Sequence, residues 1–167
     1  MLLQLTTYNL QPKTYNLQPT TKMDNYTFQK DVPTYCVTAE SFPEGILAAH
    51  QKLHAGLQPN ERRNYFGISW RDKTGKIIYK AAAEMMDGES MPDLETFVIK
   101  NGPYNAFYIY DYRQNTDSIG EAFELLLKQH EVDPHGYCLE WYINDKDVKC
   151  MVPLGKEYQE FTGLNKE

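Results

Sequence analysis

The order of the predicted elements constrains the fold of this chain more than any single motif. A strand, a helix and two more strands are predicted over residues 33–39, 41–57, 64–71 and 76–86. The same order returns later, after a strand at residues 94–100, as residues 104–112, 118–130, 137–143 and 148–154. Two such units can join their strands in one sheet and pack both helices on one face, which leaves the opposite face for a groove. The sequence therefore predicts an α+β fold of two pseudo-symmetric βαββ modules with a mainly antiparallel sheet and a ligand groove between the modules.

Each predicted helix begins with the same short signature. Ser41 stands three residues before Glu44, and Ser118 stands three residues before Glu121. In such a capping box, each side chain bonds a free backbone N–H at the helix start. A largely apolar stripe then recurs at helical spacing, namely Ile46, Ala49, His50, Leu53 and Leu57 in the first helix, and Ile119, Ala122, Phe123, Leu126 and Leu127 in the second. These stripes predict that both helices pack against the sheet.

The strand predicted at residues 137–143 carries the main candidate functional residue. Strand alternation places Leu139 and Trp141 on one face, and Glu140 beside Tyr142 on the other. A carboxylate is costly to bury in an apolar strand unless a partner compensates its charge. We therefore expect Glu140 to lie in a pocket that receives a ligand, with a purely structural hydrogen-bonding role as the alternative.

Composition and motifs argue against several classes of site. The 167 residues carry a net charge of −6, whereas a general nucleic-acid binder would show a basic stripe. No apolar run approaches the roughly 20 residues that a membrane helix needs, and no GxGxxG or phosphate-binding loop is present. His50 and His54 lie one helical turn apart, but no suitable acidic partner accompanies them. We expect no metal, no cofactor, no direct nucleic-acid binding and no membrane partner.

The cysteines and the N-terminus bear on location and domain limits. Three cysteines form no CxxC pair, and no signal peptide is evident, which predicts free thiols in the cytoplasm. The hexapeptide Thr-Tyr-Asn-Leu-Gln-Pro occurs at residues 7–12 and again at 14–19, and the proline ending each copy prevents a continuous helix. We expect a polar, flexible extension over residues 1–25, a folded domain over 26–160 and a tail over 161–167.

Three short stretches carry a resemblance to a known family. They are residues 64–69 (NYFGIS), residues 100–107 (KNGPYNAF), and residues 139–142 (LEWY) followed by 152–154. In their order they resemble the GyrI-like small-molecule-binding domain, the effector-binding domain of AraC- and MerR-type regulators, over residues 24–160. We find no helix-turn-helix pattern before residue 30, so the chain resembles the stand-alone members rather than a complete transcription factor.

The resemblance implies a function and a set of site residues. It implies a ligand groove between two βαββ modules, with an acidic residue at the Glu140 position and aromatic residues around it. Our leading hypothesis is therefore binding, sensing or sequestration of amphipathic small molecules, including cations, because tyrosine faces supply apolar area and cation–π attraction. The candidate ligand-binding residues are Glu140, Tyr142, Tyr65 and Tyr104 by motif, and Trp70 and Tyr108 because alternation allows them to line a cavity.

Two alternatives stay open. Some stand-alone members of the resembled family hydrolyse cyclopropane-containing alkylating compounds, and Glu140 would then be the catalytic general base. Other members are associated with gyrase inhibition, which would make this chain a protein-interaction module with a protein partner.

Overall fold

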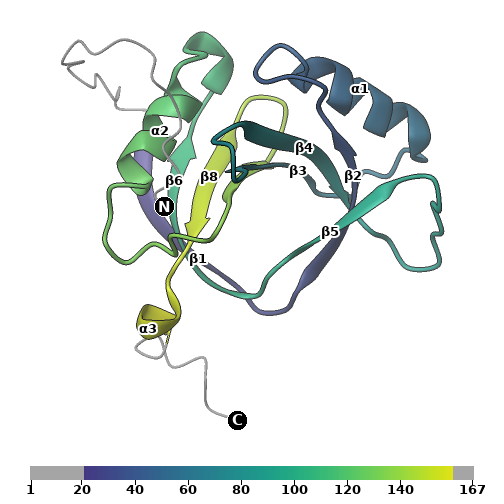
Figure 1. Ribbon diagram of the computed structural model, residues 1–167. Coiled ribbons are helices and arrows are strands. Elements are labelled where there is room, and N and C mark those ends of the chain that lie inside the picture. The colour runs from purple at the N-terminus through teal and green to yellow at the C-terminus, as the bar shows by residue number, and fades with distance from the viewer. Residues whose placement is uncertain (1–20, 160–167) are drawn as a thin grey trace.

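The computed structural model describes residues 21–159, which form one eight-stranded sheet with two principal helices (Figure 1). The strands are β1 (Thr21–Phe28), β2 (Val32–Thr38), β3 (Tyr65–Arg71), β4 (Ile77–Glu84), β5 (Glu95–Ile99), β6 (Gly102–Ile109), β7 (Cys138–Tyr142) and β8 (Val148–Pro153). The helices are α1 (Ile46–Gly56), the 3₁₀ turn η1 (Tyr112–Gln114), α2 (Ser118–Leu126) and the four-residue α3 (Lys156–Gln159). The strand order is β1-β6-β8-β7-β3-β4-β2-β5, and every neighbouring pair is antiparallel. The predicted α+β class is confirmed.

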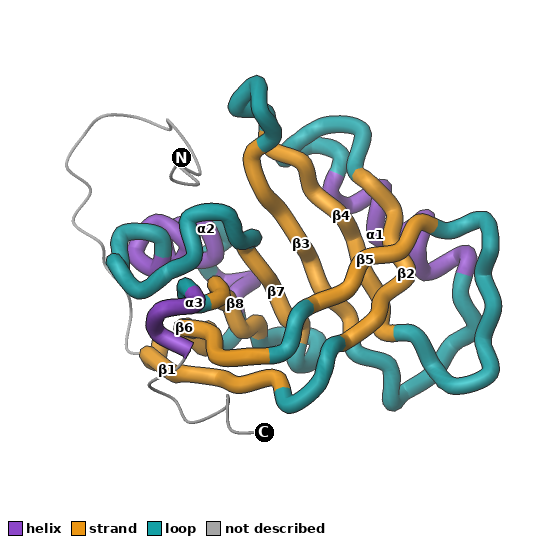
Figure 2. The backbone as a smooth tube through the Cα atoms, turned by 60° about the horizontal axis from the view of Figure 1, so that its bottom comes forward, coloured by secondary structure: helices purple, strands orange, loops and turns teal. Residues whose placement is uncertain are grey.

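The sheet curls into a half-barrel because two short connections span its ends. β1 and β2 follow one another in the chain, as do β5 and β6, yet the members of each pair lie at opposite ends of the strand order. Residues 29–31 and 100–101 make these two crossings side by side (Figures 1 and 2). The Asp31 carboxylate ties the crossings together by accepting bonds from Asn101 N at 2.8 Å and Lys100 Nζ at 2.9 Å.

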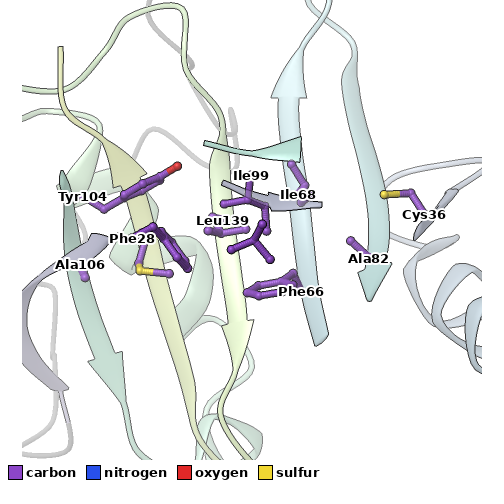
Figure 3. Close-up of a cluster of buried hydrophobic side chains, with 11 residues drawn as sticks. Phe28, Cys36, Phe66, Ile68, Ala82, Ile99, Tyr104, Ala106 and Leu139 are labelled. Atoms are coloured by element: carbon purple, nitrogen blue, oxygen red, sulfur yellow. The ribbon is translucent and has the colours of Figure 1, made fainter. Parts of the chain in front are cut away.

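The two faces of the sheet are buried in different ways. On the helix face, α1 packs on β2 and β4, and α2 packs on β6 and β8 (Figure 1). The opposite face is filled by a cluster of eleven buried side chains, several of which are shown in Figure 3. This far-face cluster consists of Phe28, Val32, Cys36, Phe66, Ile68, Ala82, Ile99, Tyr104, Ala106, Leu139 and Met151.

The far-face cluster overturns the predicted position of the groove. The sequence predicts a groove on the face opposite the helices, whereas that face is packed with apolar side chains. The reason is that β1 and β5 extend the sheet and bring Phe28 and Ile99 into this space. The candidate groove lies instead on the helix face.

Both predicted capping boxes are wrong. α1 begins at Ile46, after a turn in which Gly45 N bonds Ser41 O at 3.2 Å, and Gly45 is its N-cap. Ser118 is already the first helical residue of α2, and its hydroxyl donates to Asn115 O at 2.7 Å. Neither helix has a side-chain cap, because each serine lies at a different position relative to the helix start from the one that the motif requires.

Several boundaries also differ from the sequence prediction. β1 begins at Thr21, whereas the folded domain is expected from residue 26. The hexapeptide repeat lies outside the described residues. β6 ends at Ile109 rather than 112, since Asp111 adopts a left-handed conformation (φ 47°) and the chain turns into η1. Within residues 21–159, no helix is long and apolar enough to cross a membrane.

Candidate functional site

A cleft of about 720 Å³ lies on the helix face. One wall is α1 with the turn before it, including Leu47, His50 and His54. The other wall is η1 and the β7–β8 hairpin, where Tyr112 and Ile143 face the cleft. The remaining lining residues are Pro43, Glu44, Ile46, Asn60, Glu61, Arg63, Tyr65, Arg113, Tyr142, Asn144 and Asp145. The cleft is therefore aromatic near the sheet and carries charged groups in its surrounding loops.

A hydrogen-bond network lies next to this cleft, centred on Glu140. The Glu140 side chain is not itself among the lining residues, and the residue is 9% exposed. Its Oε2 accepts a short bond from the Tyr142 hydroxyl and a 3.3 Å bond from the Tyr79 hydroxyl. The two phenol oxygens are 3.3 Å apart, and His50 Nε2 lies 3.0 Å from the Tyr79 hydroxyl. His50 and Tyr142 thus line the cleft and also contact the buried network.

Strand pairing explains why these side chains meet. β7 pairs with β3 so that Glu140 is opposite Gly67 and Tyr142 is opposite Tyr65. Alternation then places Glu140, Tyr142 and Tyr65 on one face. The sequence predicts that Glu140 and Tyr142 share a face, but it places their groove opposite the helices, whereas in the structure these side chains lie on the helix face. A Cβ at position 67 would lie only 2.2 Å from Tyr79 Oη and 2.8 Å from Glu140 Oε2. The absence of a side chain at Gly67 therefore provides the space for the Tyr79–Glu140 contact.

No cation compensates the Glu140 carboxylate within residues 21–159. It takes part in no ion pair there, and both of its hydrogen bonds fall on Oε2, which leaves Oε1 without a bond from the described chain. Burial raises the pKa of Glu140, and the two phenol donors offset part of that rise. The protein thus holds a buried acid in an environment that disfavours its charge.

The groups around Glu140 have shifted pKa values as well. Burial, followed by the charge of Glu140, raises the pKa values of Tyr79 and Tyr142 well above their usual range, so both remain hydrogen-bond donors. Burial, followed by repulsion from His54, lowers the pKa of His50 to about 4. At neutral pH the His50 imidazole is therefore uncharged and does not repel a cation.

The predicted site residues fall into two groups. Tyr65 and Tyr142 line the cleft, and Glu140 lies directly behind Tyr142. Trp70, Tyr104 and Tyr108 lie on the opposite face, because each is an odd number of positions from the helix-face residues of its strand.

The three residues on the opposite face have protein partners. Trp70 stacks on Phe97 with ring centroids 5.9 Å apart, and the Tyr104 hydroxyl donates to Lys100 O at 2.8 Å. The Tyr108 hydroxyl donates to Asp147 at 2.8 Å. The structure does not bring these three residues to the cleft.

The sequence does not predict that Tyr79, His50 and Tyr112 belong to the site. Tyr79 reads as an ordinary strand residue, and its bond to Glu140 depends on the pairing of β3 with both β4 and β7. His50 reads as part of an apolar helix stripe, although a histidine in such a stripe is a usable signal. Tyr112 reads as the end of a strand, whereas the left-handed turn at Asp111 sends its ring towards Tyr142, with centroids 5.9 Å apart.

Comparison with known proteins reveals shared architecture without sequence similarity. No protein-family model and no curated protein sequence matches this chain. An integron cassette protein from the mobile metagenome of Vibrio cholerae has a TM-score of 0.61 and 11% identity, over 80% of this chain and 95% of that one.

Two further solved structures share the fold. SAV2435, solved bound to tetraphenylphosphonium, has a TM-score of 0.54 and 11% identity, over 81% of this chain and 95% of that one. EcmrR, solved in a complex with DNA, has a TM-score of 0.52 and 10% identity, over 83% of this chain and 59% of that one. At these identities the similarities establish the fold alone.

Proposed function

We propose that this protein binds amphipathic cationic small molecules in the cleft, with Glu140 as the compensating charge. The observation that carries this proposal is a buried carboxylate that has no cationic partner in residues 21–159 and one unbonded oxygen, directly behind an aromatic cleft wall. A cationic ligand would supply the missing charge. Because burial strengthens the interaction between opposite charges, this position favours a cation over a neutral molecule of similar shape.

The cleft also provides the apolar part of such a site. A cation above the rings of Tyr65, Tyr112 or Tyr142 gains cation–π attraction of roughly 0.5–2 kcal/mol. The ligand would meet the Tyr142 ring first, and Glu140 would act from behind it. Flat aromatic contacts place few demands on ligand shape, so we expect the site to accept several cations.

The fold supports the same assignment. SAV2435, which shares the half-barrel, was solved bound to the aromatic cation tetraphenylphosphonium. We further infer a GyrI-like domain built from two modules, β2-α1-β3-β4 and β6-α2-β7-β8. From the centre of the sheet outward, one module has the strand order β3-β4-β2 and the other has β7-β8-β6. In both modules the third strand of the βαββ unit is therefore between the other two, which supports this inference.

A calorimetric titration tests the proposal. Tetraphenylphosphonium is the cationic probe, and triphenylphosphine oxide is the neutral aromatic probe. We expect the wild type to bind the cation and to gain several degrees in Tm at saturating concentration, whereas Glu140→Gln loses most of that gain. Glu84→Gln is the matched control, because Glu84 lies on the opposite face and bonds Asn64 at 2.7 Å. Equal binding of the cation by the wild type and Glu140→Gln would contradict the proposal.

Stability measurements separate lost binding from lost folding. Because the folded-state pKa of Glu140 is raised, the folded protein binds a proton more tightly than the unfolded chain, and the stability of the free protein decreases as pH rises through that pKa. Glu140→Gln removes this cost. We therefore expect the variant to be at least as stable as the wild type at neutral pH in urea unfolding, with a difference that shrinks towards acid pH.

The raised pKa of Glu140 also suits the alternative role of a general base in hydrolysis. Mass spectrometry of a cyclopropane-containing alkylating compound after incubation with the protein would show the addition of one water molecule. Loss of this product in Glu140→Gln, with the compound still bound, would favour a hydrolase over a binding protein.

A further inference from the structure

The Tyr79 hydroxyl has a single proton and three polar neighbours. Its oxygen lies 3.3 Å from Glu140 Oε2, 3.3 Å from the Tyr142 hydroxyl and 3.0 Å from His50 Nε2. A phenol donates one hydrogen bond, so a proton given to Tyr142 or His50 is lost to Glu140. The Tyr142 proton is already donated to Glu140 in a short bond. The group that bonds the Tyr79 oxygen from the other side therefore decides whether Glu140 has one donor or two.

His50 reaches the Tyr79 oxygen because α1 is anchored on the sheet beside it. Ala49 and Leu53 are buried between α1 and strands β2 and β4, and the half-buried His50 follows at the edge of this contact. Its ring lies edge-on to both phenols, with centroids 5.9 Å from Tyr79 and 5.5 Å from Tyr142. The imidazole thus contacts both side chains that donate to Glu140.

The tautomer of His50 determines the direction of the bond between its Nε2 and Tyr79. A neutral imidazole carries one N–H, on either Nε2 or Nδ1. With the proton on Nε2, His50 donates to the Tyr79 oxygen, and the Tyr79 proton is available to Glu140. With the proton on Nδ1, Nε2 becomes an acceptor for the Tyr79 proton, and Glu140 keeps Tyr142 alone. Because hydrogen bonds to the charged form of an acid favour that form, the first arrangement stabilises ionised Glu140.

The other titratable groups around this network leave that role to His50. Glu140 and His50 are faced by Tyr79 of β4, Tyr142 and Cys138 of β7, Cys150 of β8, Tyr65 of β3, Tyr112 of η1 and His54 of α1. The cleft lining adds Glu44, Glu61, Arg63, Arg113 and Asp145. Burial, followed by the charge of Glu140, raises the pKa of both thiols, so they stay uncharged at neutral pH. Within residues 21–159, only the two phenols hydrogen-bond the Glu140 carboxylate.

This inference rests on the proposed function. We propose that His50 is a positioning residue for cation binding: its Nε2–H bonds the Tyr79 oxygen, directs the Tyr79 hydroxyl to Glu140 and so keeps that carboxylate ionised for the ligand. His50 acts through Tyr79 and needs no contact with the charge of the ligand. Its pKa of about 4 supports this role, because the imidazole then supplies a donor at neutral pH without a positive charge that would repel the cation.

Two substitutions separate the donor from the shape of the side chain. His50→Gln keeps an N–H donor close to the position of Nε2 and cannot ionise, whereas His50→Leu keeps a side chain of similar size without a donor. Their affinities for tetraphenylphosphonium are measured by calorimetry from about pH 5 to pH 9. Because the cation binds ionised Glu140, the affinity of the wild type should fall as pH decreases through the pKa of Glu140.

The position of this pH profile is the decisive readout. Loss of a donor raises the pKa of Glu140 further, so the profile of His50→Leu should move to higher pH by about one unit, with about tenfold weaker binding on its acid side. Well above the midpoint, the two proteins should bind the cation alike. The profile of His50→Gln should stay with that of the wild type. A change that only distorts the cleft would weaken binding equally at every pH.

A double-mutant cycle tests whether His50 acts through Tyr79. Tyr79→Phe removes the hydroxyl that links His50 to Glu140, and it should move the pH profile in the same direction as His50→Leu. In the combined variant the two shifts should not add, because the second substitution removes a bond that no longer has a function. Additive shifts would overturn the inference. Circular dichroism confirms that each variant is folded.

Nitrogen-15 NMR of the wild type tests the tautomer without any substitution. Correlations between the ring nitrogens and ring protons show which nitrogen carries the proton, and the signal missing from His50→Gln identifies His50. We expect protonated Nε2 and unprotonated Nδ1 at neutral pH, with and without tetraphenylphosphonium. The opposite tautomer would overturn the inference, since Nε2 would then accept the Tyr79 proton.

The outcomes distinguish this inference from the proposed function. Identical pH profiles for the wild type and His50→Leu, with tetraphenylphosphonium still bound through Glu140, would overturn the role of His50 and leave the proposed function standing. The same holds if His50→Gln fails to restore the profile, or if His50→Leu weakens binding equally at every pH. No binding of tetraphenylphosphonium by the wild type would remove the proposed function, and this inference with it.

Discussion

Gly67 illustrates how one absent side chain shapes the network next to the cleft. Its backbone lies under Tyr79 and Glu140, and any Cβ there would overlap the Tyr79 hydroxyl at 2.2 Å. Tyr79 is 1% exposed and Glu140 is 9% exposed, so neither side chain can move aside without disturbing packed neighbours. The identity of residue 67 therefore determines whether the two side chains can hydrogen-bond.

Gly67→Ala should consequently disturb both stability and binding. We expect a loss of about 1–3 kcal/mol in the free energy of unfolding, the usual cost of overpacking, and a weaker affinity for tetraphenylphosphonium because Glu140 is displaced. Urea unfolding and calorimetry measure the two effects. Gly120→Ala is the matched control: nothing lies within 4 Å of a Cβ there, and alanine in α2 should stabilise the helix by up to about 1 kcal/mol. Unchanged stability and affinity in Gly67→Ala would contradict this account.

Alternation predicts the side-chain faces at the residue scale but not their partners. It places Glu140 with Tyr142, and Leu139 with Trp141, and the register confirms both pairs of faces. Alternation alone cannot say which face carries the cleft. It also cannot predict that Glu140 meets Tyr79, because that contact requires β3 to pair both with its hairpin partner β4 and with β7, and the two residues are 61 positions apart in the sequence.

At the scale of elements, η1 and the β7–β8 hairpin together form one wall of the cleft. Hydrogen bonds to the Asp147 side chain hold these two elements together. This carboxylate accepts from the Asp111 backbone N–H at 3.0 Å through Oδ1 and from Tyr108 at 2.8 Å through Oδ2. Tyr112 N also bonds Lys146 O at 2.9 Å. These contacts hold the left-handed turn at Asp111 and so place the Tyr112 ring beside Tyr142.

Asp147→Ala should loosen this wall. Because a hydrogen bond to a charged group contributes about 1.5–3 kcal/mol, we expect a loss of about 2 kcal/mol in the free energy of unfolding and a weaker affinity for tetraphenylphosphonium. Asp145→Ala is the control: Asp145 lies two residues before Asp147 in the same hairpin turn and has no side-chain bond in the described structure, so this variant should stay within about 0.5 kcal/mol of wild type. A similar loss of stability in both variants would exclude the specific role of Asp147.

The effect of Asp147 also has a defined pH dependence. The Asp111 N–H bond, followed by the Tyr108 and Asn144 bonds, holds the pKa of Asp147 below its usual range. Its contribution is therefore complete above the unfolded-state pKa near 4 and is lost as pH falls through the folded-state value. The stability difference between wild type and Asp147→Ala should shrink only in that acid range.

The sequence predicts the existence and type of most elements, because hydrophobic periodicity reports them directly. It fails at their ends. Ser41 and Ser118 satisfy the local capping pattern, yet the turns before α1 and α2 place the helix starts elsewhere. β1 is missed because Thr21–Phe28 is a largely polar edge strand, and only its pairing with β6 makes it extended.

At the scale of the whole molecule, the half-barrel separates a packed face from the face that carries the cleft. The packed face is closed where the two crossings meet. There the Tyr137 hydroxyl accepts from Lys100 N at 2.9 Å and lies 2.7 Å from the Tyr104 hydroxyl, which donates to Lys100 O. No local pattern predicts this closure, because it depends on the pairings of β1 with β6 and of β2 with β5, whose strands lie far apart in the sequence.

If the two faces are independent, a change at this closure should affect stability alone. Tyr137→Phe removes the hydroxyl that links Lys100 and Tyr104, and we expect a loss of about 1 kcal/mol in urea unfolding with an unchanged Kd for tetraphenylphosphonium. Tyr142→Phe is the counterpart on the helix face. It removes a donor from Glu140, which favours the protonated acid, and should weaken cation binding. Equal loss of binding in the two variants would show that the two faces are coupled. The ligand-binding site would then have to extend beyond the cleft between α1 and the β7–β8 hairpin.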